Sequence, residues 1–418
     1  MLGDQFCQWV TAITIPAAYA VYLLSGLALT LITKWLVLGK LKEGNYPVWS
    51  FYFLRWWLVR LAIDRNSGRL SVLRHTPFIR WWYRLMGAKI GKGVVIDTTI
   101  ITEPDLISIG DNSVLSEYSS IQCHIFDNGL LKIQKVSIGK NCVLGTGSVA
   151  LSGSHMCDGS ATRPLTLVDP SAEFPANTVW EGSPAVCLPI KSKPIKPANF
   201  LQSFFIAIFQ VIGLLVVVIV DSIPLFTVYV VNSYLFVTIG VIGAVCLIPV
   251  ILVSSAIIHL IIIVIFKWIL IGKVKPMKYS PHGSYFVRRW FIERLLMSPA
   301  TVLLTSHFMM TPIGKWFYRA LGAKIGTRTM LPSLFLPPIC EANLFTMKDN
   351  SFVGSTFVSC NIFEDGEYEV ILGNFTIFRL LIVSFFFFNF LFFIFYLIII
   401  LLLINFILIF RFIFILII

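Results

Sequence analysis

Two long apolar stretches constrain this chain more than any other feature. The first runs from about Gln5 to Thr33, and the second runs from Phe200 to Phe266. About 20 apolar residues are enough for a helix to cross a lipid bilayer. We therefore predict one transmembrane helix over residues 1–39 and a transmembrane helical hairpin over residues 199–267. Lysines flank the second stretch on both sides, which favours an even number of crossings with both ends cytoplasmic.

The composition agrees with an integral membrane protein that crosses the bilayer several times. Hydrophobic residues make up 57% of the 418 residues, charged residues make up 13%, and the mean hydropathy is +0.84. These values exclude a disordered chain, a coiled coil and an ordinary soluble enzyme. We interpret the net charge of +12 as a topology signal and as contact with lipid head groups; no nucleic-acid-binding pattern is present. The eight cysteines have no C-x-x-C or zinc-ligand spacing, so we expect no metal and a reducing compartment.

The C-terminal stretch, residues 375–418, has a different composition. It consists almost wholly of Phe, Ile and Leu, and it lacks the Gly and Ala that membrane helices use for packing. Nearly all of its residues can be encoded by codons of T and A alone. We therefore interpret this low-complexity tail as translated non-coding sequence, an artefact of the gene model. If it is genuine, it crosses the membrane once or twice.

The chain also contains an internal repeat, with an offset of about 233–237 residues. Each copy is predicted to consist of a membrane-spanning segment, a connector with basic and aromatic residues, and a soluble module. The connectors are residues 40–86 and 268–321, which we expect to lie in the lipid head-group layer. The modules are residues 87–190 and 322–374, and the second is predicted to be truncated. The matching segments are Lys34–Lys40 and Lys267–Lys273, Trp82–Gly91 and Phe317–Gly326, and Cys123–Asp127 and Cys360–Glu364.

A six-residue period begins after Gly87. Aliphatic residues recur at every sixth position, and several are followed by Gly. This period fits neither a helix nor a simple strand, but it fits a triangular parallel β-helix in which each step makes one short strand and one turn. Interruptions near Pro104 and at residues 127–135 predict loops that leave the coil. The residues predicted to point inward are Ile90, Ile96, Ile109, Leu115, Ile121, Ile138, Leu144 and Ala150.

This segment resembles the left-handed β-helix (hexapeptide-repeat) acyltransferases. The resemblance rests on Asp97–Leu106, Ile109–Asp111, Gln122–Asp127 and Trp180–Ala185. The larger arrangement is similar to the membrane-bound terminal region of nonribosomal peptide synthetases such as epsilon-poly-lysine synthetase. The resemblance implies a mixed membrane protein in which transmembrane helices alternate with left-handed β-helix modules. It also implies a homotrimer, and a donor that is acyl-coenzyme A or a carrier-bound phosphopantetheine thioester.

His124 is the strongest candidate for catalysis. Imidazole titrates near neutral pH and suits a general base, and the resemblance implies a base that takes a proton from an acceptor hydroxyl or amine. Asp127 is predicted to orient the ring. The alternative is a solvated loop histidine. Asn361 stands at the matching place in the second copy and cannot act as a base, so that module is predicted to be inactive.

Two further residues have weaker claims to chemistry. His155 could pair with His124 or bind a metal, but a structural role explains it better. Cys123 recurs as Cys360 beside Asn361, which favours packing over a role as nucleophile.

The residues Trp180, Gly182, Ser183, Pro184 and Ala185 are predicted to bind the donor. They resemble the end of the family's solenoid, where a pantetheine arm lies along exposed backbone groups. Gly allows close approach of the backbone to such a ligand. The alternative is an ordinary cap that closes the coil.

Together these features favour a membrane-anchored acyltransferase-like protein that transfers an acyl or aminoacyl group from a thioester to a hydroxyl or amine. Its expected partners are the lipid bilayer and a carrier protein or peptide synthetase, with the modules in the cytoplasm. The alternative is a non-catalytic, trimerising β-helix scaffold in a membrane-bound biosynthetic complex. A transporter is disfavoured, because the apolar stretches hold few buried charged candidates apart from Asp221 and His259.

Overall fold

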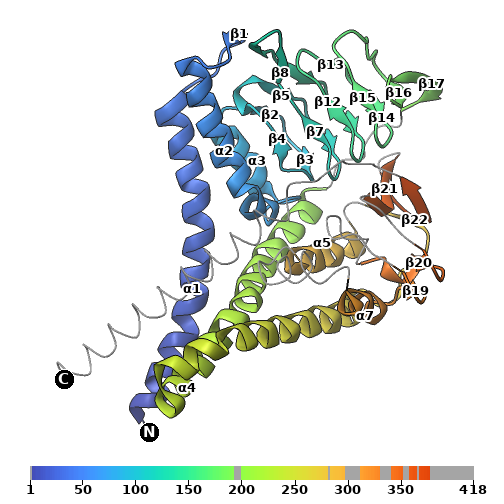
Figure 1. The fold of residues 1–418 in the computed structure, drawn as a ribbon. Helices are drawn as coiled ribbons and strands as arrows, with labels where there is room; N and C mark the ends of the chain where they lie inside the picture. The colour runs from blue at the N-terminus through green and yellow to red at the C-terminus, as the bar shows by residue number, and fades with distance from the viewer. Residues whose placement is uncertain are drawn as a thin grey trace.

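The computed structural model describes residues 2–192, 199–280, 283–296, 311–329, 340–351, 357–364 and 367–376. Two long helices, α1 and α4, extend to one side of the molecule, and the β-strands lie on the other side beside shorter helices (Figure 1). The helices are α1 (Leu2–Thr33), which continues as a π-helical turn (Lys34–Leu38), α2 (Phe51–Ser71), α3 (Pro77–Leu85), α4 (Phe200–Leu270), α5 (Ser284–Leu296) and α7 (Pro312–Ala320).

Helices α1 and α4 coincide with the two long apolar stretches. The segments Ile13–Leu38 and Leu201–Leu270 are long and apolar enough to cross a membrane. At Gly240 the backbone of α4 leaves the helical region, with φ at 76°, so the element consists of two arms. Asp221 on one arm lies 3.7 Å from His259 on the other, so the arms meet away from the bend.

The first unit, residues 1–192, contains a three-sided parallel β-helix. Each side is one sheet whose neighbouring strands are about one coil apart in sequence. One side has the order β13-β10-β5-β2, the second β17-β16-β14-β11-β6-β3, with β17 antiparallel, and the third β15-β12-β7-β4. The strands are β2 (Lys89–Ile90), β3 (Val95–Ile96), β4 (Ile100–Ile101), β5 (Ile107–Ile109), β6 (Val114–Leu115), β7 (Ser120–Ile121), β10 (Val136–Ile138), β11 (Val143–Leu144), β12 (Val149–Ala150), β13 (His155–Met156), β14 (Ala161–Thr162), β15 (Leu167–Val168), β16 (Thr178–Glu181) and β17 (Val186–Lys191).

The six-residue period correctly predicted the interior of this coil. All eight residues predicted to point inward are buried, and they belong to one hydrophobic core that also takes in side chains of α1, α2 and α3. Glycines at the corners let successive coils pack closely. A Cβ atom on Gly110 would come within 2.5 Å of the carbonyl carbon of Gly139, so only Gly fits there. The fold prediction is therefore confirmed for the parallel β-helix.

A second, antiparallel sheet projects from the coil at one of the predicted interruptions. It consists of β8 (His124–Asp127), β9 (Leu130–Ile133) and β1 (Gly44–Pro47), in the order β1-β9-β8. The two-residue turn Asn128-Gly129 has positive φ at both positions, which matches the twist of the β8–β9 hairpin. The backbone N–H of Gln134 donates to the carbonyl of Cys123 at 2.9 Å and closes the base of this hairpin.

The first connector is helical, as expected, but protein covers one face of it. Helix α2 packs along α1 and buries Trp56, Val59 and Ile63 in the β-helix core. The opposite face carries exposed apolar side chains. Only the outer face of α2 can therefore lie in the head-group layer predicted for this connector.

The second unit, residues 199–376, repeats much of this plan in a shorter form. Its parallel pair, β19 (Lys324–Ile325) and β20 (Thr346–Met347), corresponds to β2 and β5. Its antiparallel sheet has the order β18-β22-β21, corresponding to β1-β9-β8. The bounds are β18 (Lys278–Tyr279), β21 (Phe357–Glu364) and β22 (Glu367–Thr376). The tail interpretation concerns residues that, from 377 onward, lie outside the described part of the chain.

Individual contacts are repeated in the two units as well. The indole N–H of Trp35 donates to the carbonyl of Leu85 at 2.9 Å, and that of Trp268 donates to the carbonyl of Ala320 at 2.8 Å. The stacked rings of Tyr46 and Tyr52 have a counterpart in Tyr279 and Tyr285. The internal repeat is thus a repeat of three-dimensional structure.

Candidate active site

The structure places His124 where the chain leaves the β-helix. It is the first residue of β8, directly after Cys123, the last residue held in the coil. Its side chain is 16% exposed, and its ring lies edge-on to the rings of Trp56 and Phe126, at centroid distances of 4.9 and 5.7 Å. His124 is therefore held in a defined orientation and is still accessible at one edge.

Glu103 holds the other side of the imidazole. Its Oε1 lies 3.0 Å from Nδ1 of His124 and accepts the indole N–H of Trp56 at 3.0 Å. Its Oε2 accepts the backbone N–H of Cys123 at 3.3 Å. The carboxylate is buried, with 2% of the side chain exposed. It is paired on every side, as a buried charge requires.

The coil itself brings Glu103 and His124 together. Glu103 follows β4 and His124 follows β7, and these strands pair in register, with Ile101 opposite Ile121. Glu103 has φ at 44°, a left-handed conformation that turns the chain into the short 3₁₀ helix Pro104–Leu106. Sequence analysis did not single out Glu103. A signal was present, because Glu341 stands at the corresponding place before Ala342 in the second copy.

Asp127 does not contact His124 and is paired elsewhere. Its Oδ2 lies 2.6 Å from Nζ of Lys132, across the β8–β9 hairpin. Residues three apart in a strand point to opposite faces, so Asp127 cannot turn toward the ring while β8 is extended. The structure therefore gives the orienting position predicted for Asp127 to Glu103.

Cys123 is buried beneath this group. Burial raises the pKa of its thiol, and the nearby carboxylate of Glu103 raises it further. A thiol that resists ionisation is a poor nucleophile. Its environment agrees with the packing role predicted for it.

The residues predicted to bind the donor form the turn of a terminal hairpin. Trp180 of β16 packs against Phe174, with their ring centroids 4.5 Å apart. Residues Gly182–Ala185 connect β16 to β17. The carbonyl of Gly182 accepts the backbone N–H of Leu167 at 3.0 Å, so this segment caps the last coil. Within the described residues no hydrogen bond or ion pair links the hairpin to His124. Among the described strands, β17 is the outermost strand of its sheet.

Comparison with known proteins places these observations in a family. No protein-family model matches the chain. A segment of 160 residues is 33% identical to Delta-poly-L-ornithine synthetase of Acinetobacter baumannii, covering 37% of this chain and 12% of that protein. A segment of 158 residues is 29% identical to the Escherichia coli protein named as the colanic acid biosynthesis acetyltransferase WcaF, covering 32% of this chain and 84% of WcaF. Over about a third of its length the chain is thus similar to a poly-amino-acid synthetase and to a protein named as an acetyltransferase.

Solved structures with a similar fold belong to the same group of acetyltransferases. Galactoside acetyltransferase in complex with coenzyme A has a TM-score of 0.25 and 15% sequence identity, and the match covers 34% of this chain and 82% of that one. A maltose O-acetyltransferase from Clostridium difficile has the same TM-score and identity, covering 32% and 85%. The similarity is confined to about a third of the chain.

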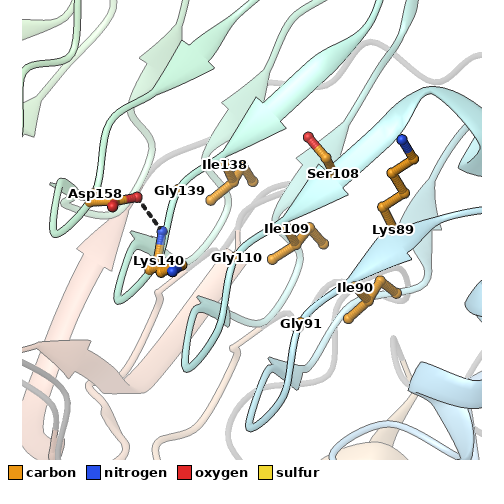
Figure 2. A pocket seen from close by; sticks show the side chains of 10 residues that line it. All are labelled: Lys89, Ile90, Gly91, Ser108, Ile109, Gly110, Ile138, Gly139, Lys140 and Asp158. Carbon is orange, nitrogen blue, oxygen red and sulfur yellow. Dashed lines mark hydrogen bonds between the residues drawn. The ribbon is translucent and has the colours of Figure 1, made fainter.

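The hexapeptide-repeat coil also has an open groove along one corner, away from His124. It has a volume of about 480 Å³ and runs across three coils (Figure 2). Figure 2 shows Lys89 and Ser108 on one side and Lys140 with Asp158 on the other. On the same side of the coil, His155 lies 2.6 Å from Ser137, so His155 has a partner of its own and does not pair with His124. The residues of the groove are Lys89, Ile90, Gly91, Ser108, Ile109, Gly110, Ile138, Gly139, Lys140 and Asp158.

In the described part of the second unit, the contacts of the corresponding glutamate differ from those around His124. Glu341 occupies the place of Glu103, but it pairs with Arg289 at 2.9 Å and accepts the hydroxyl of Tyr285 at 2.6 Å. Arg289 stands where the first unit has Trp56 in the repeat. A carboxylate neutralised by a guanidinium has no imidazole to orient, which agrees with the inactivity predicted from Asn361.

Proposed function

We propose that the chain is a membrane-anchored acyltransferase that moves an acyl or aminoacyl group from a thioester to an amine or hydroxyl. The single observation that carries the proposal is the 3.0 Å approach of Glu103 Oε1 to Nδ1 of a partly exposed His124. A carboxylate this close to Nδ1 favours a proton on that nitrogen and leaves Nε2 to act as the base. The relatives named as acetyltransferases support the same reaction class.

The reaction needs a general base, the thioester donor, and the amine or hydroxyl that accepts the acyl group; no further group is required. His124 Nε2 takes the proton of the acceptor N–H or O–H as the nitrogen or oxygen attacks the thioester carbonyl carbon. The C–S bond breaks, and the imidazolium returns the proton to the leaving thiolate. Glu103 stabilises the imidazolium while it exists. The donor is acyl-coenzyme A or a carrier-bound thioester, and the outer edge of β17 is our candidate for holding its extended arm.

The membrane anchor is assigned to α1 and to the two arms of α4, with the β-helix on the cytoplasmic side. The length and apolar composition of both helices support this placement. Association into a trimer is part of the proposal, since active sites of hexapeptide-repeat enzymes are commonly built between subunits. The chain spans 12% of the length of the ornithine synthetase, so a carrier protein or a larger synthetase is a candidate partner.

The decisive experiment measures transfer from radiolabelled acetyl-coenzyme A, or from a loaded carrier protein, to amine and alcohol acceptors by the full chain in detergent. His124→Asn should lower the rate by about 10²–10⁴-fold, the usual contribution of a general base. His155→Asn is the matched control and should keep the activity. Equal rates for His124→Asn and the unaltered chain would remove His124 from the mechanism. The absence of all transfer would leave the scaffold role.

A further inference from the structure

The surface around His124 is apolar rather than polar. Phe126 is 53% exposed and packs edge-on against Phe53 of α2 at 6.2 Å, and Trp49, which is 89% exposed, packs against the same ring at 6.4 Å. Trp49 and Phe126 both pack on the ring of Phe53, and we call these two exposed side chains the apolar rim. A soluble substrate gains nothing from so much exposed aromatic surface next to a base.

The apolar rim continues onto the long helices. On α2, Phe53 and Trp57 are four residues apart and lie on the same side, so the surface runs from the rim along the helix. Leu54, Leu58 and Leu61 extend it. The candidate span Ile13–Leu38, whose helix α1 packs against α2, adds Leu29, Ile32 and Leu36. Apart from the half-buried Phe53, all of these side chains are exposed. The surface at His124 is thus joined to that of a helix able to cross a membrane.

The chain also holds the site close to the end of that helix. The candidate span ends at Leu38, and strand β1 begins at Gly44. Strand β1 pairs with β9, and β9 pairs with β8, which begins with His124. Lys40 and Lys42 lie in the short connection, where lysines can meet anionic head groups. Exposed Trp49 fits the same layer, since Trp is favoured at membrane–water interfaces.

We infer that the acceptor is a membrane amphiphile whose amine or hydroxyl head reaches His124 while its tail lies over the apolar rim. This inference rests on the proposed function and adds the class of acceptor. The acceptor, rather than the donor, is assigned to the rim because the base must touch the group that it deprotonates. The lipid surface is the occupant favoured over a protein partner, because the rim is continuous with the apolar face of α1.

The first test compares acceptors that differ only in their tails. The full chain in lipid nanodiscs is given butylamine or dodecylamine with radiolabelled acetyl-coenzyme A. We expect dodecylamine to be used at least about tenfold better by kcat/KM. Trp49→Ser changes the ring of the rim that does not touch His124, so it should lower that preference and leave the butylamine rate unchanged. Trp316→Ser, an exposed tryptophan of α7, is the control and should keep the preference. Equal use of both amines by the unaltered chain would overturn the inference.

The second test does not depend on activity, and it separates the membrane contact of the rim from the proposed acyl transfer. A photo-crosslinking amino acid is placed at position 49 or 126 in the full chain in nanodiscs, with position 140 on the β-helix as control. We expect lipid adducts at 49 and 126 and none at 140. Adducts to protein alone would overturn the inference and identify a second copy or a carrier as the occupant. Lipid adducts without any acyl transfer would keep the membrane contact and refute the proposed enzyme.

Discussion

At the scale of single residues, the two units differ in the partner of one buried glutamate. Both have a buried glutamate at the same place in the coil, Glu103 and Glu341. In the first unit it faces an imidazole, and in the second it faces the guanidinium of Arg289. An arginine stays charged at any physiological pH, whereas a histidine can take up and release a proton. The change of partner alone therefore separates a group suited to catalysis from an inert ion pair.

The role of Glu103 as a positioning residue can be tested by Glu103→Gln. The amide keeps the shape but no longer stabilises the imidazolium, so kcat should fall by about 10²-fold, toward the low end of the range for general bases. KM for the acceptor should change little, because Glu103 lies against the ring of His124 and not at the surface that meets the acceptor. Asp127→Asn is the matched control and should leave kcat unchanged. A rise in KM with kcat unchanged would show that Glu103 does not act through His124.

At the scale of the elements, the long helices are held together by polar side chains. Asp221 and His259 lie on the two arms of α4, and the hydroxyl of Tyr19 on α1 donates to Asp221 at 3.4 Å. All three side chains are buried. The charged candidates that sequence analysis noted within the apolar stretches thus lie next to each other. A polar contact among apolar helices fixes which faces meet.

Loss of this contact should loosen the three helices. Asp221→Leu is expected to lower the free energy of unfolding by about 0.5–2 kcal/mol, the range found for hydrogen bonds between membrane helices. Thermal unfolding in detergent, followed by circular dichroism, measures the change. Ser254→Ala, an exposed position on α4, is the control and should have little effect. A variant as stable as the unaltered chain would show that apolar packing alone holds α1 to α4.

At the scale of the whole molecule, the second unit supports the first through buried polar groups. The indole N–H of Trp290 donates to the carbonyl of Arg74 at 2.9 Å, and Arg294 donates to the carbonyl of Ser71. In the first unit Arg74 lies 3.4 Å from Asp97 and 3.8 Å from Glu117. These contacts join α5 to the turn between α2 and α3. Through these contacts the second unit supports the turn between α2 and α3 of the first unit.

This junction should make stability depend on pH. Burial, together with the charges of Asp97 and Glu293, raises the pKa of Glu117 from 4.5 to about 7. Between about pH 4.5 and 7 the folded chain holds a proton that the unfolded chain releases, so stability declines over this range and levels off above pH 7. We expect the melting temperature to fall by about 2–4 °C between pH 5 and pH 8. Glu117→Gln should flatten this decline, whereas Glu173→Gln, at an exposed position, should not.

The opposite pH limit belongs to Asp97. Burial alone would raise its pKa, but the neighbouring His75 and Arg74 lower it to about 2. The stability that this carboxylate contributes is present at neutral pH and is lost only in strong acid. Asp97 therefore does not contribute to the decline between pH 5 and pH 8.

The repeating features of the fold were predictable from the sequence, and the junctions were not. The six-residue period identified the buried positions from Ile90 to Ala150, because a coil repeats one local geometry. Glu103 was within reach of the same argument, since residues about one coil apart lie side by side. Trp56 was not, because its contact depends on how α2 packs against the coil. Asp127 was predicted to orient His124 because it is close in sequence, but in the extended strand β8 the two side chains point to opposite faces.

Strand β1 limits how far the N-terminus can be shortened to obtain this domain without its apolar helix. It is the outermost strand of the sheet that carries His124, and it lies only six residues beyond the candidate span. A version shortened to remove the oily N-terminus must still begin before Gly44. It must also replace Lys34, whose ammonium lies 2.9 Å from the buried carboxylate of Asp105. Cutting later would remove the edge strand of the sheet that positions His124.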